Sequence, residues 1–185
     1  MTALIVLGIV VILVLIGVGL YNSLVRARVR ADEAWSGIST QLKRRHDLIP
    51  NLVETVKGYA SHEKGVLEKV TELRSRAMSA TTPGQVAQSE GLLTQALRGL
   101  YVVAESYPDL KANQNMLSLQ EELTSTENKV AFSRQAYNDA VMGYNTARET
   151  FPNSIIAGAT GFGPAQLFEL EAPAVERAAP KVSFT

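Results

Sequence analysis

The sequence contains no cysteine, and this absence removes several classes of function at once. Disulfide bonds, thiolate metal sites and cysteine nucleophiles all require the missing side chain. Histidine is scarce as well, with two residues in 185, so a histidine-rich metal site is excluded. Basic and acidic residues balance at 18 each, which leaves no excess charge to attract a nucleic acid.

The motifs of common enzymes are also missing. His62-Glu63 could begin a zinc-protease motif, but residue 66 is valine instead of the second histidine. Neither histidine follows a glutamate by three positions, as the carboxylate di-metal bundles require. The sequence has no phosphate-binding loop and no nucleophile elbow. We therefore expect no catalytic residue, cofactor, metal ion or small-molecule substrate, and a protein that is not an enzyme.

The sequence begins with an apolar run from Ala3 to Leu20, which contains no charged or hydroxyl side chain. As a helix it would be about 27 Å long, close to the roughly 30 Å of a bilayer's hydrocarbon core. Tyr21 follows at headgroup depth. A cleaved signal peptide is the alternative, but no basic residue precedes the run and it is too long for a signal peptide. Residues 1–20 are predicted to be a retained, single-pass transmembrane anchor.

Charge placement predicts the orientation of this anchor. Arg26, Arg28 and Arg30 follow it, while no basic side chain precedes it. The positive-inside rule then places the remainder of the chain in the cytoplasm, and the three arginines near anionic lipid headgroups. The Lys43-Arg44-Arg45 triplet is interpreted as a solvated or lipid-proximal turn, because nucleic-acid binding requires a broader basic face with interleaved aromatic residues.

Residues 21–150 are predicted to be helical, because apolar residues recur there in heptads. The first pair of seams is Trp35, Leu42, Ile49, Val56, Val70 and Ala77 with Ile38, Leu52, Tyr59, Val66 and Leu73; Arg45 and Glu63 interrupt the pattern. The later seam is Met116, Leu123, Val130, Tyr137, Tyr144 and Phe151, beside Leu119, Thr126, Ser133, Ala140 and Ala147. Such repeats are typical of packed helices in coiled-coil-like contact.

Pro50 leaves two interpretations open. Proline favours the first turn of a helix, and Asp47 could cap a helix that starts there, so we expect helices over 21–46 and 48–80. The heptad phase continues across Pro50, however, which would fit one long, kinked helix. Two further helices are expected over 83–105, with Thr82 as cap, and over 108–150.

These elements predict an all-α fold: one transmembrane helix (1–20), an antiparallel four-helix bundle (21–150) and an irregular Gly/Pro-rich C-terminal tail (151–185). Residues 171–185 are expected to be mobile. Asn138 and Asn145 lie one heptad apart on α-helical sequence, where we expect a polar ladder that fixes helix register. A ligand or partner contact is the alternative for this pair.

The sequence resembles the LemA family of bacterial membrane proteins over nearly its whole length. The resemblance lies in an ordered series of blocks: Tyr21–Val25, Ala34–Ile38, Gln41–Glu63, Tyr107–Asn113, Leu119–Leu123, Thr126–Asn128, Tyr137–Val141, Tyr144-Asn145, Phe151-Pro152, Ile156-Ala157, Gly161-Phe162 and Phe168-Glu169. His46 departs from the family pattern, in which tyrosine is usual. The resemblance implies an anchored four-helix bundle in the bacterial cytoplasmic (inner) membrane, with a break at Pro50 and no established enzymatic activity. It also implies relatives in magnetosome membrane remodelling, and others encoded near a membrane metalloprotease.

The expected function is therefore that of a membrane-tethered scaffold or interaction module. A tether confines the helical domain to two dimensions and raises the effective concentration for self-association, so we expect a homo-oligomer. An adaptor or regulator of a membrane protease or envelope quality-control system is the alternative, with that membrane protein as its partner. Large apolar residues of the tail are expected to dock either on the bundle or on a partner, and the candidate partner contacts are Ile155, Ile156, Phe162 and Phe168.

Overall fold

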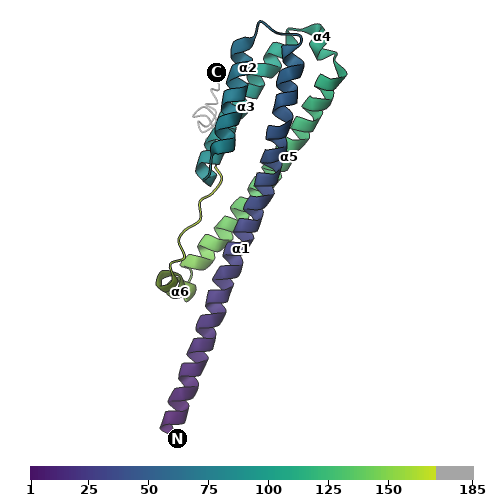
Figure 1. Cartoon of the computed structure of the whole chain (residues 1–185). Coiled ribbons are helices and arrows are strands. Elements are labelled where there is room, and N and C mark those ends of the chain that lie inside the picture. The colour runs from purple at the N-terminus through teal and green to yellow at the C-terminus, as the bar shows by residue number, and fades with distance from the viewer. Residues whose placement is uncertain (170–185) are drawn as a thin grey trace, which may run out of the picture. The chain divides into compact units, whose positions relative to one another are not determined.

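The computed structural model describes residues 1–169, and all the regular structure in that range is helical. Figure 1 shows the helices in chain order. Their bounds are α1, Thr2–Lys57; α2, Lys64–Ser79; α3, Pro83–Glu105; α4, Pro108–Lys111; α5, Gln114–Glu149; and α6, Asn153–Thr160. The predicted all-α class with a long apolar N-terminal helix is confirmed. The expected mobility of 171–185 concerns residues outside the described part.

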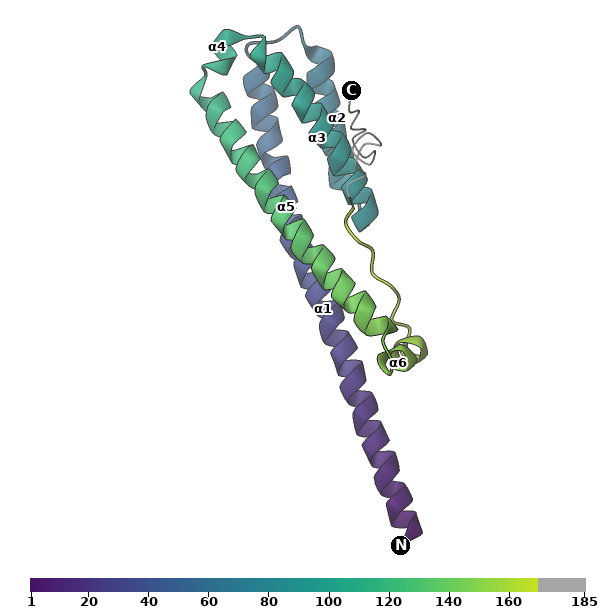
Figure 2. The same ribbon diagram turned by 180° about the vertical axis from the view of Figure 1, so that it is seen from behind.

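α1 does not break at Pro50, so the expected split of this helix, and the break that the family resemblance implied, are wrong. Figures 1 and 2 show one continuous ribbon through this region. Proline removes the amide that would bond to the carbonyl four residues earlier, here that of His46. The Arg74 Nε of α2 donates to this carbonyl instead, at 2.7 Å. A side chain from the next helix thus satisfies the acceptor that the proline leaves open. The heptad phase, which continues across Pro50, predicted the uninterrupted helix correctly.

The chain leaves α1 at Gly58, eight residues after the expected break. The amides of Tyr59 and Ala60 both bond to the Val56 carbonyl, which closes a tight turn before α2. The expected helix over 83–105 is confirmed as α3. Thr82 and Gln85 form its capping box, with Pro83 in the first turn.

The expected helix over 108–150 is divided into α4 and α5. Asn113 lies at the division, and its side-chain carbonyl accepts from the amides of Asn115 and Met116 at 2.9 and 3.1 Å. This is the geometry of an N-cap, so a new helix starts here. The expected irregular tail also differs from the structure, because residues 153–160 form α6.

The described chain divides into two compact units. Unit 1 comprises Met1–Arg44 and Ser125–Leu167, and unit 2 comprises Arg45–Thr124 and the chain from Phe168. In unit 2, α1, α2, α3, α4 and α5 contribute to one apolar core: Ile49, Leu52, Val56, Ala60, Leu67, Val70, Leu73, Ala77, Leu93, Leu97, Leu100, Ala104, Leu110, Met116 and Leu123. Most of the predicted heptad positions in this unit are therefore buried.

In unit 1 the buried apolar residues come from α1, α5 and α6: Leu24, Ala31, Ile38, Leu42, Tyr137, Val141, Tyr144 and Ala157. Tyr137 and Tyr144 confirm the heptad seam of the last long helix. Phe151, its expected final member, is 76% exposed, because α5 ends at Glu149 and the seam does not continue past it.

Candidate functional site

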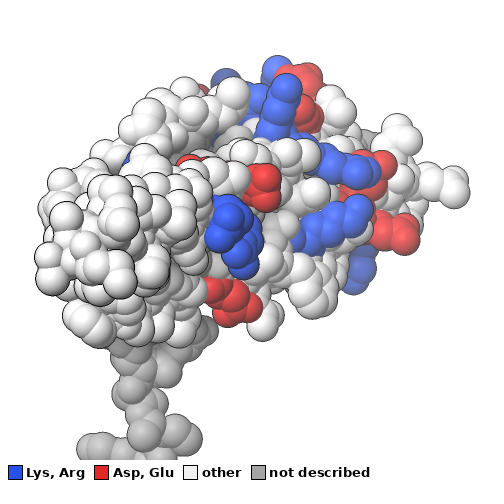
Figure 3. Space-filling model, turned by 90° about the horizontal axis from the view of Figure 1, so that it is seen from below, with Lys and Arg blue, Asp and Glu red and all other residues white. Residues whose placement is uncertain are grey.

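The largest uncovered apolar surface of unit 1 is the N-terminal part of α1. An 18-residue window of this helix has a mean hydropathy of 3.3, and none of it is buried. Figure 3 views the molecule from the end that carries this segment, where the nearest atoms carry no charge. Lys, Arg, Asp and Glu side chains are interspersed behind it. One helix in the described chain is thus long and apolar enough to cross a membrane.

The basic residues after this segment fall into two groups along α1. Arg26, Arg28 and Arg30 are exposed and lie roughly 9–15 Å beyond Leu20 along the helix axis, within reach of lipid headgroups. Lys43 lies about 35 Å beyond Leu20, several times the Debye length of about 8 Å at physiological salt.

The expectation of a solvated or lipid-proximal turn at Lys43-Arg44-Arg45 is wrong in two respects. The triplet lies inside the continuous helix α1, and Arg45 is buried. The Arg45 Nη1 donates to the Glu90 Oε2 at 2.8 Å, and its Nη2 donates to the Thr94 hydroxyl at 2.9 Å. Within unit 2, Arg45 is thus a core residue that pairs α1 with α3.

His46 shares the same acid. Its Nε2 lies 2.6 Å from the Glu90 Oε1, so both carboxylate oxygens of Glu90 are engaged. All three residues are buried. A buried cluster of this kind adds little net stability, but losing one partner strands a charge and typically costs about 3–5 kcal/mol. Both Glu90 carboxylate oxygens and both Arg45 Nη atoms thus have partners on the neighbouring helix, which indicates a packing role for the cluster.

A second polar cluster, in unit 1, holds the segment after α6 against α5. The Tyr144 hydroxyl donates to the Gly163 carbonyl at 2.7 Å, and the Tyr137 hydroxyl donates to the Gln166 carbonyl at 2.7 Å. Between them, Asn145 forms two bonds of 3.0 Å with Ala165: its amide donates to the carbonyl, and its side-chain oxygen accepts from the backbone N–H. We call residues 163–166 the strap. Asn145 therefore binds backbone of its own chain instead of forming the expected helix-register ladder.

Tyr137 also contacts α1 through its ring. Its ring contacts the Trp35 ring at a centroid distance of 5.2 Å, which fixes α5 on α1. Burial raises the pKa of the Tyr137 phenol above its ordinary value of 10.0, and the nearby Asp32 carboxylate adds to the increase. The phenol is therefore neutral, and able to donate to the strap, well into the alkaline range.

The four predicted partner-contact residues have different environments. Ile155 is 61% exposed and Ile156 is half-buried. Phe162 is half-buried, with its ring 5.6 Å from that of Tyr21. Phe168 is 1% exposed, so its expected role as an exposed contact is wrong: the ring is core. Ile155 is the most exposed of these four residues.

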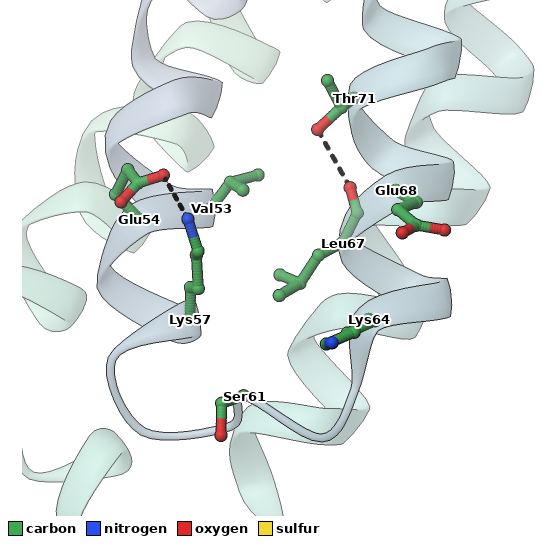
Figure 4. Close-up of a pocket in the computed structure, with 8 residues that line it drawn as sticks. All are labelled: Val53, Glu54, Lys57, Ser61, Lys64, Leu67, Glu68 and Thr71. Atoms are coloured by element: carbon green, nitrogen blue, oxygen red, sulfur yellow. Dashed lines mark hydrogen bonds and ion pairs between the residues drawn. The ribbon is translucent and has the colours of Figure 1, made fainter.

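An open cleft of about 620 Å³ lies between the C-terminal end of α1 and α2, within unit 2 (Figure 4). Leu67 and Val53 form its apolar part, and its rim carries two lysines and two glutamates. None of the polar side chains that line it is buried. Lys57 Nζ lies 3.4 Å from the Glu54 Oε1 across the rim, with both side chains more than half exposed. Such a solvent-exposed ion pair contributes little energy.

No group of three or more potential metal-ligating residues occurs within residues 1–169. His62, the histidine of the incomplete zinc motif, is exposed at the turn between α1 and α2.

Sequence reasoning missed Glu90, Arg74 and the tyrosine contacts with the strap. Arg45, a charged residue in an apolar heptad position, was a signal that a buried acid must exist elsewhere. For the strap the signal was the Tyr137 and Tyr144 pair with Asn145, whose polar tips need partners when their rings are buried.

Comparisons of the sequence with known proteins identify relatives of this chain. The sequence profile of the LemA family matches residues 34–184. Protein LemA of Metamycoplasma hominis is 27% identical over 144 residues, which cover 76% of this chain and 64% of that protein. Magnetosome protein MamQ 2 of Paramagnetospirillum magneticum and magnetosome protein MamQ of Magnetospirillum gryphiswaldense are each 24% identical over 180 residues, or 83% of this chain and 66% of the relative. The chain thus spans slightly less than two thirds of the length of these relatives.

The family profile covers most of the chain, including both seams that build the helical units and the tyrosines that hold the strap. A relative that bears the family's name aligns over three quarters of it. By this match, the chain belongs to the LemA family.

Proposed function

We propose that this protein is a non-enzymatic, single-pass membrane protein whose helical units act as a scaffold or interaction module at the membrane surface. The observation that carries the proposal is the continuity of α1. Its first turns form an apolar surface that nothing in the described chain covers, and the same helix continues into the buried core of unit 2. A helix that is apolar all round over this length is stable in lipid.

The polar groups of unit 2 support an interaction role over catalysis. The buried polar groups of unit 2 at Arg45, His46 and Glu90 bond to one another, and the cleft beside α2 is lined by solvated charges. Enzyme sites instead collect partly desolvated groups in a concave site where a substrate can reach them.

We further propose that unit 2 is an antiparallel four-helix bundle. Its core is shared by four longer helical segments, from α1, α2, α3 and α5, and by the one-turn helix α4; the connections between them are short, which favours antiparallel neighbours. The tether provides the orientation: exposed Arg26, Arg28 and Arg30 directly after the apolar segment support a bundle on the cytoplasmic side of the inner membrane.

Sidedness is tested with one introduced thiol, since the sequence has no cysteine of its own. Phe132 on α5 is 74% exposed and suits a Phe132→Cys reporter. In intact spheroplasts this thiol is expected to resist a membrane-impermeant maleimide, and to react after the inner membrane is permeabilised. Reaction in intact spheroplasts would place the bundle outside.

Self-association is the remaining part of the proposal, with membrane lipid and further copies of the chain as partners. Confinement to a membrane plane raises the effective concentration of any contact between the helical units. Crosslinking in cells followed by mass spectrometry is expected to recover pairs of this chain, with a mass above the monomer in mild detergent. A monomer without crosslinked partners would contradict the scaffold role. Recovery of a membrane protease in place of a second copy would replace self-assembly by an adaptor role.

A further inference from the structure

α6 is held beside the point where α1 leaves its apolar segment. Tyr21 is the first residue after that segment, and its ring packs edge-on against Phe162, with centroids 5.6 Å apart. Phe162 follows α6 directly. Figures 1 and 2 both show α6 beside the part of α1 that continues from the apolar segment. All of these residues belong to unit 1, so this placement is a property of one compact body.

The turn at Gly161 and the strap fix the position of α6 beside α1. Gly161 adopts φ +75°, a left-handed conformation that glycine takes without strain. The amide of Phe162 then bonds back to the Ala157 carbonyl at 3.1 Å, which closes the end of α6. Directly afterwards, Tyr144 and Asn145 bind the strap to α5. The end of α6 is thus followed directly by a contact with α1, at Phe162, and by the bonds of the strap to α5.

The surface of this region is apolar and uncharged. Phe151 and Ile155 are 76% and 61% exposed and lie four residues apart. No charged residue occurs from Thr150 to Phe168. Phe132 on α5 is similarly exposed, but it has charged residues close by on both sides in the sequence, Lys129 and Arg134, whereas Phe151 has them only on its N-terminal side, at Arg148 and Glu149. The uncharged surface therefore coincides with the end of the membrane segment.

We propose that α6, with Phe151 before it, is a second membrane contact that lies in the interface of the leaflet where α1 emerges. This inference rests on the proposed function, because the bilayer is located by α1. Exposed aromatic and aliphatic side chains such as Phe151 and Ile155 bury favourably at the boundary between headgroups and acyl chains, and no charged side chain from Thr150 to Phe168 opposes this burial. The continuity of this surface with the anchor selects lipid as the occupant over a soluble partner, and it reassigns Ile155 from protein contact to lipid contact.

Three single-cysteine variants of the full-length chain test the proposal: Phe151→Cys, the matched control Phe132→Cys, and Leu13→Cys within the anchor. Each is labelled with an environment-sensitive fluorophore and reconstituted into vesicles of phosphatidylcholine and phosphatidylglycerol. Quenching is measured with lipids that carry a nitroxide either near the glycerol end or near the middle of an acyl chain. Phe151 and Phe132 match in residue type and exposure, at 76% and 74%, so their labels differ mainly in position.

The label at Phe151→Cys is expected to be quenched several-fold more strongly by the shallow nitroxide than the label at Phe132→Cys. The label at Leu13→Cys is expected to respond most to the deep nitroxide. Equal, weak quenching at Phe151→Cys and Phe132→Cys, with Leu13→Cys quenched by the deep nitroxide, would overturn this inference and leave the anchor intact. An unquenched label at Leu13→Cys would overturn the proposed anchor and this inference together.

Discussion

At the residue scale, the positions that organise this protein are the ones that break its apolar pattern. Arg45 occupies a heptad position in α1 and is buried against Glu90, and Tyr137 and Tyr144 occupy heptad positions in α5 with their hydroxyls bonded to the strap. Each places one polar group in a buried layer, where it needs a particular partner. Such residues specify how the segments align, whereas leucine and valine supply most of the burial.

Tyr137 provides a prediction at this scale. Tyr137→Phe removes the hydrogen bond to the Gln166 carbonyl but keeps the ring packed on Trp35. We expect the free energy of unfolding at neutral pH to fall by about 1 kcal/mol, the usual net value of one such bond. Denaturant unfolding of the full-length protein in detergent micelles measures the change.

The pH dependence of this difference is a stricter test. Because the pKa of Tyr137 is raised in the folded state, the phenol ionises first in the unfolded chain as pH rises above 10.0. The neutral Tyr137 phenol stabilises the folded state fully below that pH, and this stabilisation is lost as the pH rises toward the folded-state pKa. The difference in the free energy of unfolding between the wild type and Tyr137→Phe should therefore become smaller at alkaline pH. The other five tyrosines are common to both proteins, so a difference independent of pH would contradict the assignment.

At the scale of the element, side-chain donors and acceptors decide where helices start and continue. Asn113 starts α5 with its side-chain carbonyl, and Arg74 allows α1 to continue through Pro50. The second effect is non-local: Arg74 lies 28 residues from the carbonyl it satisfies. Local propensity alone therefore favoured a break that tertiary structure prevents.

A double-mutant cycle on Arg74 and Pro50 tests this explanation. Arg74→Met keeps an aliphatic side chain but leaves the His46 carbonyl without its donor, which should lower the free energy of unfolding by about 1–3 kcal/mol. Pro50→Ala restores a backbone amide that can bond to the same carbonyl. In that background Arg74→Met should cost clearly less. Arg76→Met, at an exposed position of the same helix, is the control and should have little effect. An equal cost of Arg74→Met in both backgrounds would mean that the His46 carbonyl is not the reason.

The sequence was sufficient to predict the helical class, the apolar N-terminal segment, α3 with its Thr82 cap and most buried heptad positions, because these follow from local pattern. The continuation of α1 through Pro50 and the division of α4 from α5 depended on particular side-chain hydrogen bonds, and the existence of α6 did not follow from the local pattern. The predicted site residues show the same difference between local pattern and tertiary packing. Arg26, Arg28 and Arg30 are exposed as the pattern required, whereas Phe168 is buried because of tertiary packing that periodicity does not encode.

At the scale of the whole molecule, one helix connects two chemical environments. From Leu4 to Val18, every large side chain of α1 is exposed, while the C-terminal part of the helix supplies Ile49, Leu52 and Val56 to the core of unit 2. Exposed apolar surface of this extent is unfavourable in water, at about 25 cal/mol per Å². Lipid around residues 3–20 would remove this surface from water, and the proposed orientation, scaffold role and interfacial placement of α6 all depend on it.

Extraction of membranes with alkaline carbonate tests this placement in lipid most directly. Wild-type protein is expected to remain in the membrane pellet. A variant with Val10→Arg and Val14→Arg should move to the supernatant, because each arginine near the centre of a membrane helix costs about 2.5–3.5 kcal/mol. Val102→Arg, at a position of α3 that is 65% exposed, should stay in the pellet with wild type. Wild-type protein in the carbonate supernatant would contradict the account.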